Sequence, residues 1–466
     1  MSLRYLGGFI TASYNPLKVP NPPTIGTVTP GSAQVSVAFT APSNVGGSAI
    51  TSFLVLVTDS SSGATFSNTG SASPIVVTGL TNGNTYTAKV LAVNSYGPSA
   101  FSAPSGSFSP ATLGLFSWGN NNFGQLGLNT VDISQSSPVQ VGALITWNEV
   151  FSGNYHSAAI KTDGTLWTWG SGSSGRLGHN NNINQSSPVQ VGALTTWVTA
   201  SCSTGSTFAI KTDGTLWSWG QGNQGILGSN STTDKSSPVQ VGSLTNWSKV
   251  SASSQSNSCA AIKTDGTLWT WGYNTFGQLG QGTAPTSKSS PVQVGALTNW
   301  SQVSTCFVHM VAVNTSGQLF TWGYGFKGQL GNNSTTDRSS PVQVGALTTW
   351  SKVAAGYTAC AAIKTDGTLW TWGGNNNGQL GTGNPNNNQS SPVQVGALTT
   401  WSQVSSASYS CAAIKTDGTL WSWGINTNGR LGLNDTVTKS SPVQVGALTD
   451  WSQVSAGGTF AIGILS

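Results

Sequence analysis

Few residues of this chain could do acid–base, nucleophilic or metal chemistry, and they do not gather into one set. Glu149 is the sole glutamate among 466 residues, and the three histidines, His156, His179 and His309, fall in different parts of the sequence. Catalysis needs several converging polar groups that shift one another's pKa, and a metal site needs several ligands at close spacing. The sequence therefore predicts no enzyme, no metal site and no cofactor.

Most other reactive residues have a structural explanation. Five aspartates share one position in a repeated Asp-Gly turn, namely Asp163, Asp213, Asp265, Asp366 and Asp417. Cysteines share another position with residues of different chemistry, namely Cys259, Cys360 and Cys411 with Ser157, Thr207 and Met310. Such interchange is typical of a small buried side chain, not of a ligand or a disulfide. We therefore expect free thiols and a reducing compartment.

These residues belong to a long repeat that must position them. The phrase SSPVQVGALTTW, which ends at Trp350, occurs in seven close variants whose prolines are 50, 50, 53, 50, 51 and 50 residues apart. The prolines are Pro138, Pro188, Pro238, Pro291, Pro341, Pro392 and Pro442. A period of about 50 residues is typical of a stacked-repeat or propeller protein.

Each unit contains four short β-rich runs, two of which are joined by Lys-Thr-Asp-Gly. Asp-Gly in this place predicts a two-residue hairpin in which both turn residues have positive φ. Four antiparallel strands per unit predict a propeller blade. The array begins at Gly114 with the second half of this hairpin and ends near Ile464 with the first half. We therefore expect a seven-bladed β-propeller with clasp closure, in which both ends complete one blade.

The tryptophans indicate how the blades pack. All 19 lie in the array at three recurring positions. One set precedes glycine, as Trp372 does, and a second closes the repeated phrase, as Trp350 does. A third set includes Trp370 and is replaced by Phe116 and Phe320 in two units. An aromatic residue fixed in every unit is typical of core, so all three positions are predicted to pack between blades.

Three motifs of the repeat carry a family resemblance. Trp372-Gly373, Gly378–Gly381 and Pro392–Val395 match the pattern W-G, G-Q-L-G and P-V-x-V, which resembles the regulator of chromosome condensation (RCC1-like) repeat family. The resemblance covers about three quarters of the chain and implies a seven-bladed propeller. It implies no single function, because the family includes nucleotide exchange factors, ubiquitin ligase modules and surface proteins. A GTPase regulator would need an acidic face and loop insertions, which these near-identical units do not supply.

Residues 21–111 differ from the array and contain short alternating runs separated by Gly- and Asn-rich turns, which predict a β-sandwich. The stretches VAFTAPSNVGGSAITSFLVLV and GLTNGNTYTAKVLAVNSYGPS resemble a fibronectin type III domain. Phe39 stands where the family usually has Trp, and Leu80 and Tyr86 match its tyrosine corner. Such domains bind partners or act as spacers, so this resemblance assigns no ligand.

The composition excludes further classes of function. Only 6% of the residues are charged, against about a quarter in a typical protein, and the net charge of +5 is spread without a run of Lys or Arg. The footprint of a nucleic-acid-binding protein is therefore missing. The first residues hold no apolar run long enough for a signal peptide or membrane helix, so we expect no export signal and no membrane insertion.

Binding is the remaining function, and we expect it where the units differ. Two variable segments, one before the second apolar run and one before Gly-x-Leu-Gly, carry aromatic residues among Asn and Ser. Such residues suit neutral partners such as sugars or another protein surface, and packing at the rim is the alternative explanation. The candidate partner-binding residues are Tyr155, Phe307, His309, Tyr357, Tyr409, Phe123, Tyr273, Phe276, Tyr324 and Phe326.

Residues 1–20 precede both domains, and their opening, MSLRYLGGFITASYNPL, resembles the starts of structural proteins of tailed bacteriophages. The resemblance implies a virion appendage or decoration protein, in a tail fibre or on a capsid. The arm would attach it to other virion proteins, and the propeller, residues 112–466, would face a host glycan or protein. A bacterial surface-associated interaction module is the alternative, and a homo-oligomer stays open. The candidate docking residues are Arg4, Tyr5, Leu6, Phe9, Ile10 and Tyr14.

Overall fold

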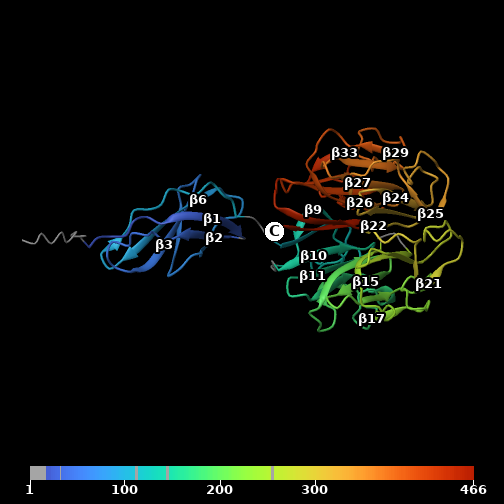
Figure 1. The fold of residues 1–466 in the computed structure, drawn as a ribbon, viewed down its shortest axis with the longest axis horizontal. Helices are drawn as coiled ribbons and strands as arrows, with labels where there is room; N and C mark the ends of the chain where they lie inside the picture. Colours follow the sequence, from blue (N-terminus) through green and yellow to red (C-terminus); the bar gives the residue numbers. More distant parts are fainter. Residues whose placement is uncertain (1–16, 32, 111–113, 143–145, 253–256, 466) are drawn as a thin grey trace, which may run out of the picture. The chain divides into compact units, whose positions relative to one another are not determined.

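The computed structural model describes residues 17–31, 33–110, 114–142, 146–252 and 257–465 (Figure 1). The chain divides into two compact units, Met1–Leu113 and Gly114–Ser466. The regular structure of both units consists of β-strands paired into sheets, and the helical segments of the described residues are three short 3-10 turns. The turns are Ser173–Gly175, Asn223–Gly225 and Thr427–Gly429. The all-β class predicted from the sequence is therefore confirmed.

The first unit is a sandwich of two antiparallel sheets. One sheet has the order β1 (Thr24–Gly31), β2 (Gln34–Thr40), β5 (Ile75–Thr78). The other has the order β4 (Thr65–Gly70), β3 (Ile50–Asp59), β6 (Tyr86–Asn94), β7 (Gly97–Pro98). Alternate residues of β2 and β3 are buried, so their inner faces form the core. Phe39 lies in this core with its ring centre 4.7 Å from that of Phe53.

Tyr86 forms the corner that the sequence predicts. Its hydroxyl oxygen accepts a hydrogen bond from the backbone N–H of Thr81 at 2.9 Å, and its ring stacks on Phe108 with centres 6.0 Å apart. Leu80 is buried beside it in the same core. A buried phenol needs such a polar partner, and here the partner fixes the chain just before β6.

Within the described residues, the second unit contains seven antiparallel four-stranded sheets, the blades of a propeller (Figure 1). The first strands of the blades are β10 (Trp147–Ser152), β14 (Trp197–Cys202), β18 (Trp247–Ser251), β22 (Trp300–Thr305), β26 (Trp350–Ala355), β30 (Trp401–Ser406) and β34 (Trp451–Ala456). The second strands are β11 (His156–Lys161), β15 (Ser206–Lys211), β19 (Ser258–Lys263), β23 (His309–Asn314), β27 (Ala359–Lys364), β31 (Ser410–Lys415) and β35 (Phe460–Leu465).

The outer half of each blade repeats in the same way. The third strands are β12 (Leu166–Gly170), β16 (Leu216–Gly220), β20 (Leu268–Gly272), β24 (Leu319–Gly323), β28 (Leu369–Gly373), β32 (Leu420–Gly424) and β8 (Gly114–Gly119). The fourth strands are β13 (Gln185–Gln190), β17 (Lys235–Gln240), β21 (Lys288–Gln293), β25 (Arg338–Gln343), β29 (Gln389–Gln394), β33 (Lys439–Gln444) and β9 (Gln135–Gln140). The fourth strand contains the phrase proline, which suits an edge because proline has no N–H to offer a further strand.

One blade contains strands from both ends of the array. Its order is β34-β35-β8-β9, with β35 antiparallel to β8 and Phe460 opposite Gly119. In Figure 1 the label β9 accordingly stands beside the red strands of the C-terminal end. The hydroxyl of Ser455 accepts a hydrogen bond from the backbone N–H of Ser152 at 3.0 Å, so this blade is also bonded to the one that contains β10.

Hydrogen bonds join neighbouring blades at two places, one near the centre of the propeller and one at its perimeter. Near the centre, a serine of the first strand accepts from the next blade, as Ser201 does from the Ala252 N–H at 2.8 Å. At the perimeter, the N–H of Asn180 donates to the Ser236 carbonyl of the next blade at 2.8 Å, and the other blades repeat this bond. Because these bonds use backbone groups at blade edges, they satisfy atoms that the sheets leave unpaired.

The Asp-Gly hairpins form, but the predicted turn type is wrong. Of the two turn residues only the glycine has positive φ, 76° at Gly367, while Asp366 does not. The Gly367 N–H donates to the Lys364 carbonyl at 3.0 Å, which makes a three-residue turn ending in a left-handed glycine. The Asp366 carboxylate accepts from the N–H and the hydroxyl of Thr368, and these bonds lower its pKa. Asp366 thus acts in the turn as an acceptor.

The tryptophans of all three sets pack between blades as predicted, although those of the third set are only partly buried. The set of Trp372 is almost completely buried, and so are the phrase-closing residues such as Trp350. Trp372 donates its indole N–H to the Gln329 carbonyl of the preceding blade at 2.9 Å. The third set is partly exposed because each ring lies at the hairpin end of its blade, where it still packs against a buried cluster that spans two blades. There the ammonium of Lys364 lies 3.6 Å from the centre of the Trp370 ring.

Candidate functional site

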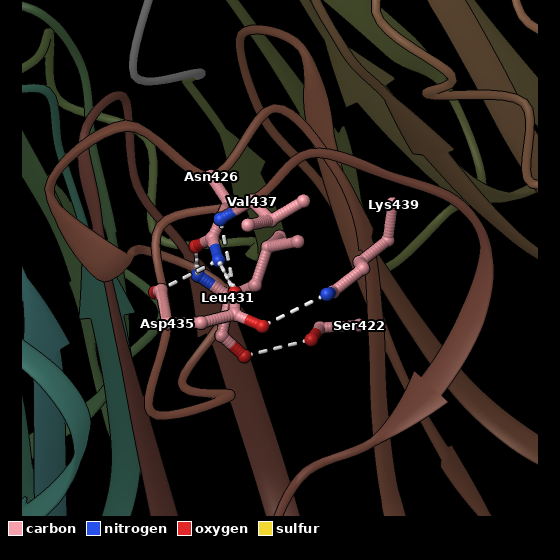
Figure 2. A network of polar contacts seen from close by, with 6 residues as sticks. All are labelled: Ser422, Asn426, Leu431, Asp435, Val437 and Lys439. Atoms are coloured by element: carbon pink, nitrogen blue, oxygen red, sulfur yellow. Dashed lines mark hydrogen bonds and ion pairs between the residues drawn. The ribbon is translucent and has the colours of Figure 1, made fainter.

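Figure 2 shows the polar network that holds the loop between β32 and β33. Asn426 accepts from the Leu431 N–H at 2.9 Å and donates to the backbone oxygen and carboxylate of Asp435 at 2.9 and 2.7 Å. Asp435 also forms an ion pair with Lys439 at 2.8 Å and accepts from the Val437 N–H. Because its own polar side chains fix the loop, other positions in it can vary without loss of shape.

An equivalent anchor holds this loop in every blade. The hydroxyl of Ser422 donates to the Leu431 carbonyl at 2.7 Å, as Figure 2 also shows. The corresponding donors are Ser117, Thr168, Ser218, Thr270, Thr321 and Thr371. Antiparallel pairing brings the loop to the same end of the blade as the turn between the first two strands. The bond from the Tyr324 N–H to the Val308 carbonyl, 2.8 Å, joins the two segments. The variable segments therefore share one face, which we call the aromatic face.

The first cluster on this face, the loop patch, consists of Phe276, Tyr324 and Phe326 from two neighbouring blades. The ring centres of Phe276 and Tyr324 are 4.7 Å apart, and those of Tyr324 and Phe326 are 6.2 Å apart. Phe326 is 61% exposed, and the ammonium of Lys327 lies 5.4 Å from its ring. An exposed group of touching rings can bury a large apolar area against a partner.

The second cluster, the tyrosine patch, consists of Phe307, Tyr357 and Tyr409. Each comes from the first turn of a different blade, and the three blades are consecutive. The ring centres of Phe307 and Tyr357 are 5.5 Å apart, and those of Tyr357 and Tyr409 are 5.4 Å apart. Burial, with nearby Tyr357, raises the pKa of Tyr409, so this hydroxyl stays protonated and can donate a hydrogen bond at neutral pH.

Other candidates lie apart from these clusters. Phe123 and Tyr155 form a pair with ring centres 5.4 Å apart, and they come from two adjacent blades. Tyr273 is partly exposed in the loop that follows β20. The structure thus places nine of the ten candidate residues on the aromatic face and brings eight of them into ring contacts, whereas partner binding by them stays a prediction.

His309 does not belong to a binding surface, so its assignment as a partner-binding residue is wrong. Its side chain is fully buried, and its Nε2 lies 3.1 Å from the Cys360 Sγ of the next blade. Burial lowers its pKa to about 4, so the ring is neutral at pH 7. His156 occupies the same position in another blade, with its Nε2 2.9 Å from the Thr207 hydroxyl. Both histidines fill the core between blades.

The candidate docking residues of the arm lie outside the described residues, and the docking arm stays a prediction. These residues are Arg4, Tyr5, Leu6, Phe9, Ile10 and Tyr14.

In the described ranges, no group of three or more His, Cys, Asp or Glu side chains could hold a metal ion. All five cysteines are buried free thiols, and burial raises the pKa of Cys202 to about 12. Burial also raises the pKa of Glu149, against the effect of a hydrogen bond from Thr199. Among the helices described, none is long and apolar enough to cross a membrane.

Sequence reasoning missed two features. Lys327 follows Phe326 directly, and this adjacency could have indicated that a cation lies beside the exposed ring. Grooves between blades at the perimeter were also missed, because the residues that line them are repeated and were attributed to the core. The signal there is the partly polar setting of Trp269 and its equivalents, which always occur with a lysine on the neighbouring strand.

The closed set of four-stranded sheets defines the second unit as a β-propeller. The profile of the Regulator of chromosome condensation (RCC1) repeat matches residues 114–160, 163–210 and 213–260, and that of the RCC1-like domain matches residues 244–465. The repeats of this chain are therefore of the RCC1 type. The profile of the fibronectin type III domain matches residues 20–107, which confirms the second resemblance.

Known proteins match parts of the array. The human E3 ubiquitin-protein ligase HERC2 is 30% identical over 229 residues, which are 48% of this chain and 5% of that protein. The Ultraviolet-B receptor UVR8 of Arabidopsis thaliana is 30% identical over 220 residues, 46% of this chain and 50% of the receptor. The chain thus spans half the length of the receptor and a small part of the ligase.

Solved structures share the propeller fold. Prp20p from Saccharomyces cerevisiae superposes with a TM-score of 0.68 at 19% identity, over 76% of this chain and 91% of that one. Human WBSCR16 superposes with the same TM-score at 20% identity, over 76% of this chain and 98% of that one. At this identity the likeness establishes the fold and not the activity.

Proposed function

We propose that this chain is a non-enzymatic binding protein that holds a protein partner on the aromatic face of its propeller. The observation that carries the proposal is the contact of Phe307, Tyr357 and Tyr409 across three consecutive blades. Rings held against one another lose little conformational entropy on binding, and they combine apolar area with hydroxyl groups. Surfaces with these properties carry much of the affinity of protein interfaces.

Relatives with the same fold support this choice of partner. The Prp20p structure is described together with binding to Gsp1p and histones, and yeast RCC1 (Prp20) has been solved bound to Kap60. The low charge of the present chain favours a partner that is recognised by aromatic and amide groups rather than by charge. The loop patch, with Phe326 and Lys327, would extend the same contact outward.

The experiment captures partners from the source lysate on immobilised full-length protein, identifies them, and measures the dissociation constant of the purified partner. The double variant Tyr357→Ser with Tyr409→Ser is expected to bind at least about tenfold more weakly, because it removes two contacting rings. Ile183→Ser is the control, since Ile183 is an exposed apolar residue in the loop between β12 and β13 of another blade. Equal affinity of the folded double variant and the wild type would refute the assignment of this face.

The finer part of the proposal is that the chain is a virion appendage, with residues 1–20 as the anchor. Its support is the resemblance of the opening residues to structural proteins of tailed bacteriophages. Full-length protein and a form that lacks residues 1–20 are sedimented with particles from the source lysate. If only the full-length form travels with the particles, the arm is an anchor. If neither form does, the virion location is rejected while the partner-binding face remains open to the first test.

A further inference from the structure

A groove recurs at the perimeter of the propeller, between the fourth strand of one blade and the outer strands of the next. Four of these perimeter grooves have volumes of about 570, 500, 480 and 300 Å³. Each is lined by a phrase-closing Trp, a partly exposed Trp of the third set and the phrase proline. In the smallest groove these are Trp247, Trp269 and Pro291. Volumes of this size accept small ligands or single units of a polymer.

In the part of the chain that the structure describes, all four grooves contain a buried indole N–H without a partner, and two of them also contain a buried oxygen without a partner. Among the described residues, the indole N–H groups of Trp247 and Trp350 make no hydrogen bond, although both side chains are at least 97% buried. The hydroxyl oxygen of Ser229 lies in the groove of Trp247, and the amide oxygen of Asn332 lies in that of Trp350. Both oxygens are also buried and unpaired. Native proteins pair most buried polar atoms, so a donor and an acceptor left together mark a place where a ligand can supply both bonds.

The tryptophans that precede glycine show that an unpaired N–H is not common to every indole of the array. Trp271 lies in the same blade as Trp247, and its N–H donates to the Ile226 carbonyl at 2.7 Å. The unpaired indoles are those that close the phrase and line the grooves, whereas those that precede glycine mostly bond to the preceding blade. The protein thus satisfies one set internally and leaves the other available.

The partly exposed tryptophan gives each groove a flat apolar wall. The ammonium of Lys263 lies 3.7 Å from the centre of the Trp269 ring, and four more Lys–Trp pairs repeat this contact. Where the ring is phenylalanine, Asn314 and Leu465 replace the lysine, because the Trp face attracts a cation best. The lysine charge is therefore engaged by the ring. The lining of the groove of Trp269 is uncharged, whereas the lining of the groove of Trp370 includes Arg338.

We propose that the perimeter grooves bind a neutral saccharide, with one sugar unit in each groove that contains both an unpaired indole N–H and an unpaired acceptor. A sugar hydroxyl that displaces the side-chain atoms covering these two groups can accept from the indole N–H of Trp350 and donate to the oxygen of Asn332. The apolar C–H face of the sugar ring packs on the part of Trp370 that the Lys364 ammonium leaves uncovered in the same groove. Amide side chains such as Gln343 lie at the wall and can reach further hydroxyls.

The repetition of the grooves favours a polymer over a protein partner. A protein partner presents one irregular surface, and such a surface suits the aromatic face, where the blades differ. A polysaccharide presents the same unit many times, and it suits sites repeated around a ring at a fixed angular step. Several weak sites of this kind would bind the polymer far more tightly than a single sugar.

The test uses full-length protein in gels that contain one polysaccharide each: dextran, mannan, galactan or starch as neutral probes, and alginate as an acidic probe. We expect retarded migration in at least one neutral gel. The double variant Ser229→Leu with Asn332→Leu removes the unpaired oxygen from two grooves. Two other units have leucine at this position, Leu128 and Leu433, so the fold tolerates the change. Calorimetry with the matching oligosaccharide should show about tenfold weaker binding at each altered groove.

The controls separate this proposal from the binding of a protein partner. Phe326→Ser alters the aromatic face and should leave retardation unchanged. Absence of retardation in every neutral gel, retardation by alginate alone, or equal retardation of the double variant and the wild type would each overturn the proposal. A proline-rich peptide is also titrated into both proteins. If the peptide binds the wild type and not the double variant, and no saccharide binds the wild type, the saccharide proposal is overturned and the grooves are assigned to peptides.

Discussion

The inter-blade core and the aromatic face are made from the same unit of about 50 residues, yet they follow opposite rules. In the core, every unit has a buried tryptophan before glycine. On the face, the position of Tyr155 is occupied in the other units by Gly205, Asn257, Val308, Thr358, Tyr409 and Thr459. A close-packed interior accepts one shape, whereas a turn at the surface accepts many. The residues that repeat hold the ring of blades together, and the residues that differ are free to bind a partner.

Two positions depart from this simple contrast between core and face. His309 stands at a position that varies among units, yet it is core. The third tryptophan set recurs in five units, yet it is partly exposed and lines the perimeter grooves. Variation therefore indicates surface only when the side chain also points away from the next blade, and repetition alone does not separate a fully buried position from one that lines a groove.

The largest expected effect is on stability when the repeated core is altered. Trp372→Ala removes a fully buried indole and leaves the Gln329 carbonyl without its donor. We expect the free energy of unfolding, measured with denaturant, to fall by about 3–5 kcal/mol. A loss of less than about 1 kcal/mol would contradict the core assignment of this set.

A smaller effect is expected when the buried histidine is titrated. Burial lowers the pKa of His309 to about 4, while the unfolded chain has the ordinary value of 6.5. Between pH 6.5 and 4 the unfolded chain binds a proton that the folded chain excludes, so stability falls as the pH falls through this window. The loss should reach roughly 2 kcal/mol at pH 5.

His309→Ser serves as the control, because Ser410 occupies the same position in another blade. This variant should show a flatter dependence of unfolding free energy on pH than the wild type between pH 6.5 and 5. Part of the slope should remain, since burial and the charge of Arg176 also hold the pKa of His156 well below its usual range. An unchanged slope would show that His309 is not neutral in the folded chain.

The bond between the two ends of the array should contribute less. Ser455→Ala removes the acceptor of the Ser152 N–H, and the expected loss is about 1 kcal/mol in the free energy of unfolding. Ala354 holds the equivalent position in another blade, so the fold tolerates alanine there. The comparison with Ser201→Ala, which breaks a bond inside the array, tests whether closure of the ring adds to the value of the bond. Equal losses would show that it does not.

The smallest effect is expected on the aromatic face. Phe326→Ser replaces an exposed ring whose main contacts are Tyr324 and Lys327, so the unfolding free energy should change by less than about 0.5 kcal/mol. Thermal unfolding of this variant beside Trp372→Ala measures the contrast between face and core in one experiment. A loss near that of Trp372→Ala would mean that the loop patch holds the fold and has no free surface to offer.

The sequence alone determined the unit, its strands and the order of the domains, because these depend on periodicity and on local turn chemistry. The Asp-Gly hairpins and the tyrosine corner around Tyr86 are examples, since neighbouring residues supply the partners of the Asp366 carboxylate and of the Tyr86 hydroxyl. The exact turn failed, because whether Asp366 acts through its φ angle or its carboxylate depends on the hydrogen bonds of Thr368.

Only the tertiary structure decided which aromatic residues meet and which polar atoms are left unpaired. Phe307, Tyr357 and Tyr409 are separated by about 50 residues each, and they touch because neighbouring blades are rotated copies of one another. The same rotation places His309 against Cys360 and Asn332 beside Trp350. Contacts between units depend on the angle between blades, which the packing of the whole ring sets and no single repeat encodes.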